Sequence, residues 1–298
     1  MTAQSLDAAV DRVDPLPRIA PSGHRVLLAA DESDAARAGE EWIRRLRWAR
    51  TPEIDVLTVA PRPGWASGIG LQTYRTAVRD AVIQAGLTEL LEAQRIANTV
   101  GSRLQEAGVR VRVWARHGGA AEEIVRMARL EATDLIVVGS SGRSSRALLW
   151  GQSVATRVAR DSDGAVLVAQ PPPPGADRLP RAVALLVGQD AAAADALRWL
   201  AAVGWLRETP MTLARIDRPG ATPPDTTVAL RQVADRASVA GTTETVLPSD
   251  RRRSIEALTA LVEHREIDLL VWPRGDGRAA DEAVRVADAA RVSVLLVP

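Results

Sequence analysis

Short apolar runs alternate along this chain with amphipathic stretches, and the alternation predicts its architecture. In the first half we expect five strands, at 26–30, 55–59, 109–114, 135–138 and 165–169. Most of these runs are apolar throughout, as strands buried on both faces of a parallel sheet are. The segments between them have helical periodicity, the longest from about 76 to 107. Strands that alternate with helices predict an α/β fold, in which a doubly wound parallel sheet carries helices on both faces.

The second half repeats the pattern of the first. Setting Trp42 against Trp199 aligns three pairs of runs: 26–30 with 183–187, 134–138 with 268–272, and 165–168 with 294–297. Two β/α units of one design account for the 298 residues. We therefore expect two tandem, doubly wound parallel sheets of five strands each, with a Rossmann-like architecture.

The chain divides into four segments where its composition changes. Residues 1–22 are polar and acidic and contain proline, so we expect a flexible N-terminal segment. The first domain is expected at 23–170. Four consecutive prolines open the segment 171–178, which we interpret as a stiff linker because proline cannot continue a strand. The second domain is expected at 179–298.

The composition argues against several classes of function. The 38 basic and 37 acidic residues nearly balance, so no excess of positive charge is available for nucleic acid. Without cysteine the chain has no disulfide, thiolate metal site or cysteine nucleophile, and its three histidines lie far apart. No run approaches the ~18 apolar residues of a membrane-spanning helix. The first residues lack the pattern of a signal peptide, and we expect a cytoplasmic protein without membrane partners.

Polar residues and glycines gather where the predicted strands end. Ligands of open α/β sheets bind at the C-terminal ends of the strands, which selects Asp31, Val59 and the segment that begins at Gly139. In that segment Gly139 and Gly142 allow the backbone to present N–H groups to an anion, and Arg143 adds positive charge. An alternative role for Asp31 is to cap the following helix.

The glycine-rich segment ends at the start of a predicted helix. Ser153 lies at the N-terminus of that helix, where free N–H groups and the helix dipole favour a phosphate. An ordinary loop has a similar composition, but two glycines directly after a buried strand favour a ligand loop. His117, in contrast, is interpreted as a solvated turn residue.

In these segments the chain resembles the universal stress protein family. The resemblance is carried by Ala30–Ser33, Gly139–Ser144 and Ser153–Val154. Nucleotide-binding members of the family have a glycine, two residues, a second glycine, nine residues, and then Gly-Ser or Gly-Thr. The resemblance covers nearly all of 24–170 and extends more weakly over 180–298, and tandem domains are common in the family.

The resemblance implies a ligand and a fold. The fold is that of the adenine nucleotide alpha hydrolases, and the ligand is ATP or a related adenine nucleotide, with which Mg²⁺ can bind. Asp31 matches the acidic residue at the nucleoside, and Val59 matches the residue whose backbone meets the adenine. Gly139 and Gly142 match the glycines of the phosphate loop, and Ser153 matches the hydroxyl that contacts phosphate.

Two positions depart from the family pattern. Ser141 stands where the family often has histidine, and the ninth residue after Gly142 is Gln152 where a glycine is expected. Gly151 lies one residue earlier. Either the loop is one residue shorter, or Gln152 replaces the third glycine and places a side chain where phosphate would approach.

The second half has lost the candidate site. Gly188 stands at the position of Asp31, and Pro273, which has no N–H to donate, stands at the position of Gly139. The stretch 274–278 is too short to replace the loop. We expect this half to be a structural partner that pairs through the final strands, either within the chain or in a homodimer.

Two hypotheses from different classes remain. In the first, the chain is a stress-response regulatory module that binds ATP in its first domain and signals to an unknown protein partner. In the second, it is a nucleotide-free structural or adaptor protein, and Gln152 favours this hypothesis. An ATP-hydrolysing enzyme is a weaker alternative, with slow hydrolysis at most, because no general base, metal-binding carboxylate pair or lysine accompanies the loop.

Overall fold

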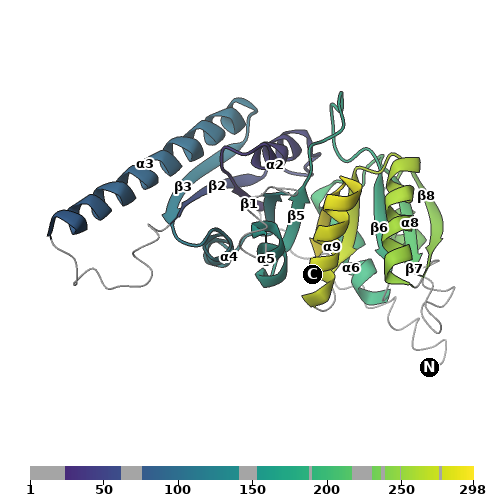
Figure 1. The fold of residues 1–298 in the computed structure, drawn as a ribbon. Helices are drawn as coiled ribbons and strands as arrows, with labels where there is room; N and C mark the ends of the chain where they lie inside the picture. Colours follow the sequence, from purple (N-terminus) through teal and green to yellow (C-terminus); the bar gives the residue numbers. More distant parts are fainter. Residues whose placement is uncertain are drawn as a thin grey trace.

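The computed structural model forms one twisted sheet with helices on both faces (Figure 1). It describes residues 24–61, 76–140, 153–187, 190–216, 230–235, 239–248, 250–274 and 277–298. No helix among these residues is both long enough and apolar enough to cross a membrane.

In the first half, strands and helices alternate as the sequence predicts. The elements are β1 (Arg25–Ala29), α2 (Asp34–Arg45), β2 (Glu53–Ala60), α3 (Thr76–Glu106), β3 (Arg110–His117), α4 (Ala120–Leu130), β4 (Leu135–Gly139), α5 (Val154–Asp161) and β5 (Ala165–Ala169). The main difference is at β3, which continues to His117. His117 is therefore the last residue of a strand, and its interpretation as a solvated turn residue was wrong.

The second half has a similar alternation, with residues 230–235 helical between its second and third strands. Its elements are β6 (Val183–Val187), α6 (Asp190–Val203), β7 (Pro210–Ile216), β8 (Gly241–Leu247), α8 (Arg251–His264), β9 (Leu269–Pro273), α9 (Gly277–Ala290) and β10 (Ser293–Val297). The expected strands at the start and end of this half are therefore present.

The strand order repeats from one half to the other. The first half has the order β3-β2-β1-β4-β5, and the second continues it as β10-β9-β6-β7-β8. Within each half every pair is parallel. The last strands of the halves, β5 and β10, pair antiparallel with Leu167 opposite Leu295. The halves thus pair through their final strands within one chain, and this pairing joins the two expected five-stranded sheets into a single sheet of ten.

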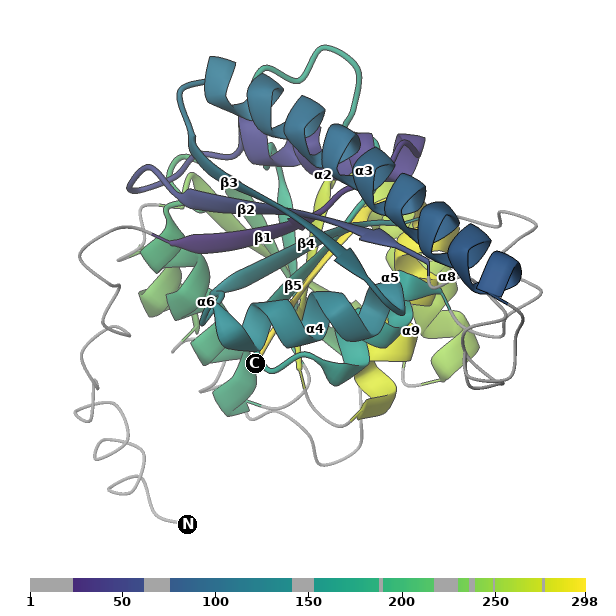
Figure 2. The same cartoon turned by 90° about the vertical axis from the view of Figure 1, so that its left-hand side faces the viewer.

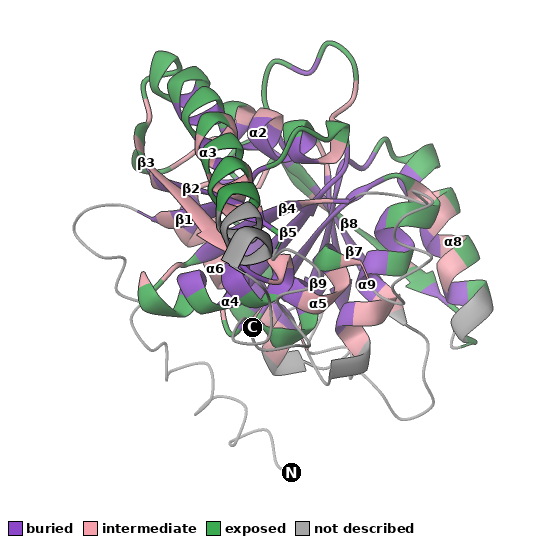
Figure 3. Ribbon diagram, turned by 60° about the vertical axis from the view of Figure 1, so that its left-hand side comes forward, coloured by how far each residue is buried: buried purple, intermediate pink, exposed green. Residues whose placement is uncertain are grey.

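The two faces of the sheet are covered by different helices. In the first half α2 and α3 lie on one face and α4 and α5 on the other (Figure 2). The core on the α2 face continues along α6, and the core on the α5 face continues along α8 and α9. The inner strands β1, β4, β5, β6, β9 and β10 are therefore buried on both sides (Figure 3), which explains why their sequences are largely apolar. The edge strands β3 and β8 have exposed and partly buried positions.

The same contact opens the repeat in each half. Asp134 precedes β4, and its carboxylate accepts a hydrogen bond of 2.8 Å from the backbone N–H of Arg25. Asp268 precedes β9, and its carboxylate accepts one of 3.3 Å from the N–H of Ala182, the residue aligned with Arg25, and one of 2.9 Å from the N–H of Arg181. These two aspartates are aligned by the sequence repeat, so the repeat extends to the contacts that fix where the first strand of each half begins.

Candidate functional site

The candidate site lies at the C-terminal edge of the first-half strands. Asp31 follows β1, Val59 is near the end of β2, and Gly139 ends β4. Because β1 pairs with β2 on one side and with β4 on the other, these three residues share one edge of the sheet. The remaining loop candidates, Gly142, Arg143, Gly151 and Gln152, lie outside the described residues, as does Gly188 of the second half.

Asp31 shapes the turn between β1 and α2. Its Oδ1 accepts a hydrogen bond of 2.8 Å from the backbone N–H of Ser33. Ser33 is the N-cap of α2, and its Oγ accepts the N–H of Ala36 at 3.1 Å. The alternative in which Asp31 caps the helix is therefore wrong. Asp31 is exposed, so its carboxylate is accessible to a ligand at the strand edge.

Gly139 is required for packing as well as for any loop function. A β-carbon at this position would lie 2.1 Å from the carbonyl oxygen of Ala35 and 2.8 Å from the backbone N of Ala36. Only glycine allows the first turn of α2 to pack this closely against the end of β4. The sequence analysis assigned Gly139 to a phosphate loop and missed this contact. The close approach brings the Asp31 turn next to the start of the glycine-rich segment.

Ser153 begins α5 as the sequence predicts. It is the N-cap of the helix, and its Oγ accepts a hydrogen bond of 3.1 Å from the N–H of Thr156. The same oxygen lies 2.8 Å from Thr156 Oγ1. The hydroxyl proton can go either to Thr156 or to an anion at the helix N-terminus. Ser153 therefore has a structural role that does not prevent it from donating to a ligand.

Val59 contributes an apolar surface to this edge. It is partly buried and packs against the core beneath α4 and α5. In the sheet it lies opposite Arg116 of β3. The Arg116 guanidinium carbon is 5.7 Å from the centre of the Trp114 ring, so this cation is stacked on an aromatic side chain.

The second half places different chemistry at the equivalent edge. Pro273 ends β9 opposite Val297, just as Gly139 ends β4 opposite Ala169. This register confirms the alignment of Pro273 with Gly139. It also makes Ser293 the equivalent of Ala165, so the sequence alignment of the last strands, 165–168 with 294–297, was wrong by one residue. The following residue, Arg274, donates from its guanidinium to the carbonyl oxygen and, at 3.2 Å, to the Oγ of Ser162 in the first half. Arg274 therefore joins the halves, and burial lowers the pKa of its guanidinium.

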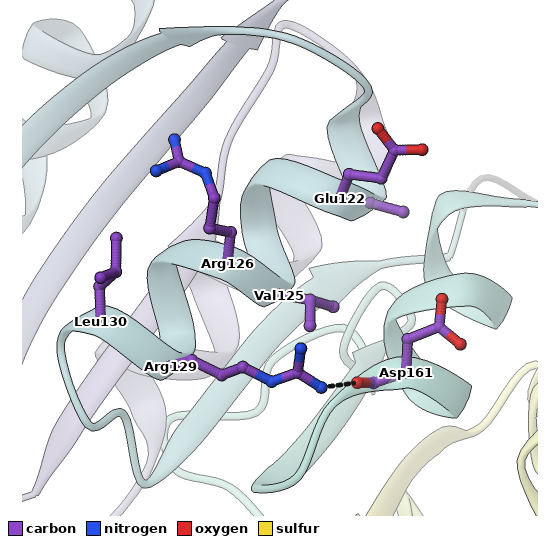
Figure 4. A pocket seen from close by; sticks show the side chains of 7 residues that line it. Glu122, Val125, Arg126, Arg129, Leu130 and Asp161 are labelled. Atoms are coloured by element: carbon purple, nitrogen blue, oxygen red, sulfur yellow. Dashed lines mark hydrogen bonds between the residues drawn. The ribbon is translucent and has the colours of Figure 1, made fainter.

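Two cavities lie away from this edge: one between α4 and the end of α5 (Figure 4), and one between α4 and the turn that connects α5 to β5. Their volumes are about 660 and 260 Å³, and both are lined by Val125 and Arg129. Arg129 donates to Asp163 at 2.8 Å and to the carbonyl oxygen of Asp161 at 3.0 Å. Its charge is thus engaged within the protein. These cavities include none of the candidate residues.

Metal-binding side chains are not clustered in the described part of the chain. No group of three or more histidine, cysteine, aspartate or glutamate side chains there is arranged to hold a metal ion.

Comparison with known proteins identifies the first half. Residues 23–170 match the universal stress protein family. A universal stress protein from Archaeoglobus fulgidus DSM 4304 is similar over 92% of this chain and 95% of its own, with 16% identity and a TM-score of 0.67. A putative universal stress protein from Pseudomonas aeruginosa UCBPP-PA14 is similar over 93% of both chains, with 11% identity and a TM-score of 0.50.

Other comparisons cover less. A family protein from Arabidopsis thaliana, solved with AMP bound, matches 49% of this chain and 90% of its own, with 15% identity and a TM-score of 0.32. No curated protein matches. The two similarities over nearly the whole chain show that both halves share the fold, and the family match is specific to the first half. Residues 23–170 of this chain belong to the universal stress protein family.

Proposed function

We propose that the first half binds an adenine nucleotide, with ATP as the expected ligand, and that the chain is a stress-response regulatory module. The observation that carries this proposal is the position of Asp31 and Gly139. Asp31 follows β1 and Gly139 ends the neighbouring strand β4, and from these two strands the chain continues in opposite directions across the sheet. Such a switch point is where doubly wound sheets bind nucleotides. The family match over residues 23–170 supports the same proposal.

Each described residue fits one part of a nucleotide. Asp31 is exposed and uses Oδ1 for the turn, which leaves Oδ2 to accept hydrogen bonds from ribose hydroxyls. The N-terminus of α5 and the Ser153 hydroxyl offer donors to a phosphate. Val59 supplies apolar surface for the base. The ligand would order this edge of the sheet, and a protein partner would recognise that change.

A nucleotide-free adaptor is the second candidate. Pro273 and Arg274 of the second half favour it, because one lacks an N–H and the other is engaged with Ser162. Those residues concern only the second half. In the first half, Gln152 is the one residue that favours the adaptor, and this motivates Gln152→Gly as a test.

Calorimetric titration with ATP tests the proposal. Wild type is expected to bind, and Asp31→Ala to bind more weakly by roughly 1–3 kcal/mol, because the charged acceptor for the ribose hydroxyls is lost. Gly142→Val is expected to abolish binding without changing the circular dichroism spectrum.

Asp34→Ala is the matched control, since this neighbouring carboxylate is exposed and pairs with Arg37 on its own helix. If wild type binds no adenine nucleotide at millimolar concentration and Gln152→Gly restores binding, the adaptor is correct and the site decayed at that residue.

A further inference from the structure

Helix α9 of the second half reaches the start of the candidate loop in the first. Ser140 directly follows Gly139 and is only 8% exposed. Its backbone N–H donates to the carbonyl oxygen of Ala169 at 2.9 Å, and its hydroxyl donates to the carboxylate of Asp288 on α9. Both donors of Ser140 are therefore engaged, one by β5 and the other by the second half of the chain.

Asp288 is itself held in place from the first half. The side-chain amide of Gln170, the residue after β5, lies 3.4 Å from the same carboxylate oxygen. This amide also donates to the carbonyl oxygen of Ala287 at 3.1 Å, and the backbone N–H of Gln170 donates to Ser293 Oγ at 2.9 Å. Gln170 is buried, so these bonds hold the end of α9 against the junction of β5 and β10.

The chain is thus fixed from both faces of the sheet where it leaves β4. On one face, Gly139 packs against the backbone of Ala35 in α2. On the other face, the Ser140 hydroxyl is bound to Asp288. These two contacts fix Gly139 and Ser140, the described start of the glycine-rich segment, beside the turn that carries Asp31.

We propose that Asp288 is a positioning residue for the nucleotide site, supplied to the first half by the second. This inference rests on the proposed function. Asp288 acts on the site by accepting the hydrogen bond from the Ser140 hydroxyl. Its negative charge does not help, because a negative charge near a phosphate site opposes anion binding. An amide at this position would keep the acceptor and remove the charge. An alanine would remove both.

The test is ATP affinity, measured by calorimetry on the full chain. Asp288→Ala and Ser140→Ala are each expected to weaken binding about tenfold, the usual effect of one lost hydrogen bond that orients a site. The double variant is expected to bind no more weakly than either single variant, since both remove the same contact. Asp288→Asn is expected to bind at least as tightly as wild type.

Asp281→Ala is the matched control on the same helix. Asp281 accepts a hydrogen bond of 2.7 Å from Arg160 near the C-terminal end of α5. Loss of this bond also weakens the packing of α9 on the first half, so the variant tests whether such weakening alone lowers ATP affinity. Its ATP affinity is expected to equal that of wild type.

Three results would overturn the proposal: wild-type affinity in Asp288→Ala, equal losses in Asp288→Ala and Asp288→Asn, or an equal loss in Asp281→Ala. Failure of wild type to bind ATP would instead refute the proposed function, and this inference with it.

Discussion

Gly139 and Ala35 are in direct backbone contact, and no side chain fits between them. The contact joins the end of β4 to the first turn of α2. A β-carbon at Gly139 would lie 2.1 Å from the carbonyl oxygen of Ala35, and because this is a backbone atom, no flexible side chain could move aside to make room. It therefore fixes two segments of the candidate site relative to each other. Asp31 lies just before α2, and the glycine-rich segment begins just after β4.

Gly139→Ala is expected to destabilise the protein by at least about 2 kcal/mol, because the new methyl group must displace the start of α2. Urea denaturation gives the free energy of unfolding. Gly241→Ala in β8 is the control, since a β-carbon there meets no atom within 4 Å, and its effect should stay within about 0.5 kcal/mol. Equal stabilities for the two variants would show that α2 does not pack on Gly139 as described.

Stability is expected to fall as the solution becomes mildly acidic, through His24. This side chain is 6% exposed and lies beside Trp48, with their ring centres 6.3 Å apart. Burial lowers the pKa of His24 below its usual 6.5, and Arg50 lowers it further, whereas Asp134 and a hydrogen bond with the backbone of Ala202 oppose the shift. The unfolded chain therefore binds the proton more tightly than the folded chain does.

The sign follows from this difference in proton affinity. The contribution of His24 to stability is complete above pH 6.5 and is lost as the pH falls through the lower pKa of the folded state. Denaturation curves between about pH 7.5 and 5.5 measure the loss. His24→Gln carries no titrating group at this site and should flatten the dependence. An unchanged slope in this variant would assign the effect to other residues.

Asp55 is expected to be important for the stability of the β2–β3 edge. It is 2% exposed and accepts hydrogen bonds of 2.8 and 2.7 Å from Arg112 and one of 2.8 Å from Trp114 Nε1. Asp55→Asn should lower the free energy of unfolding by about 2 kcal/mol, because a buried charged acceptor of three bonds is lost. Thermal melts measure the effect, and Glu92→Gln is the control. Glu92 forms an exposed ion pair with Arg95, so its loss should leave the melting temperature unchanged. Similar shifts in both variants would contradict this.

ATP is expected to bind with at most one site per chain. Pro273 and Arg274 replace the start of the loop in the second half, and Arg274 is engaged with Ser162. Calorimetric titration measures the stoichiometry directly. Two equivalent sites per chain would mean that the second half binds a nucleotide by residues other than those aligned with the first.

The sequence was sufficient to locate the strands that are buried on both faces, but it did not locate β7 and β8 of the second half. A continuous apolar run such as Ala165–Ala169 has one main interpretation in a chain of alternating strands and helices. The aspartates at 134 and 268 were aligned by the repeat, and they make the same contact in both halves. Features that depend on the pattern within a short segment could therefore be predicted from the sequence alone.

Contacts between residues that are far apart in the sequence could not be predicted in this way. A glycine at position 139 is expected both for a phosphate-binding loop and for close packing against the backbone of Ala35. Only the packing of α2 in the structure reveals the second role. The bond between Ser140 and Asp288 joins residues from opposite halves. His117 precedes two glycines, as turn residues do, yet pairing with β2 extends β3 to include it. Each of these depends on tertiary structure that a local pattern does not specify.

The antiparallel pairing of β5 with β10 lies within one chain, so the coverage of β5 does not depend on the protein concentration. Two separate copies would have to meet by diffusion, whereas two halves of one chain face each other at a fixed effective concentration set by their connection. Dilution therefore does not uncover β5. The second half is free to change its own ligand chemistry, as Pro273 illustrates, while it continues to complete the sheet and to present Asp288 to Ser140.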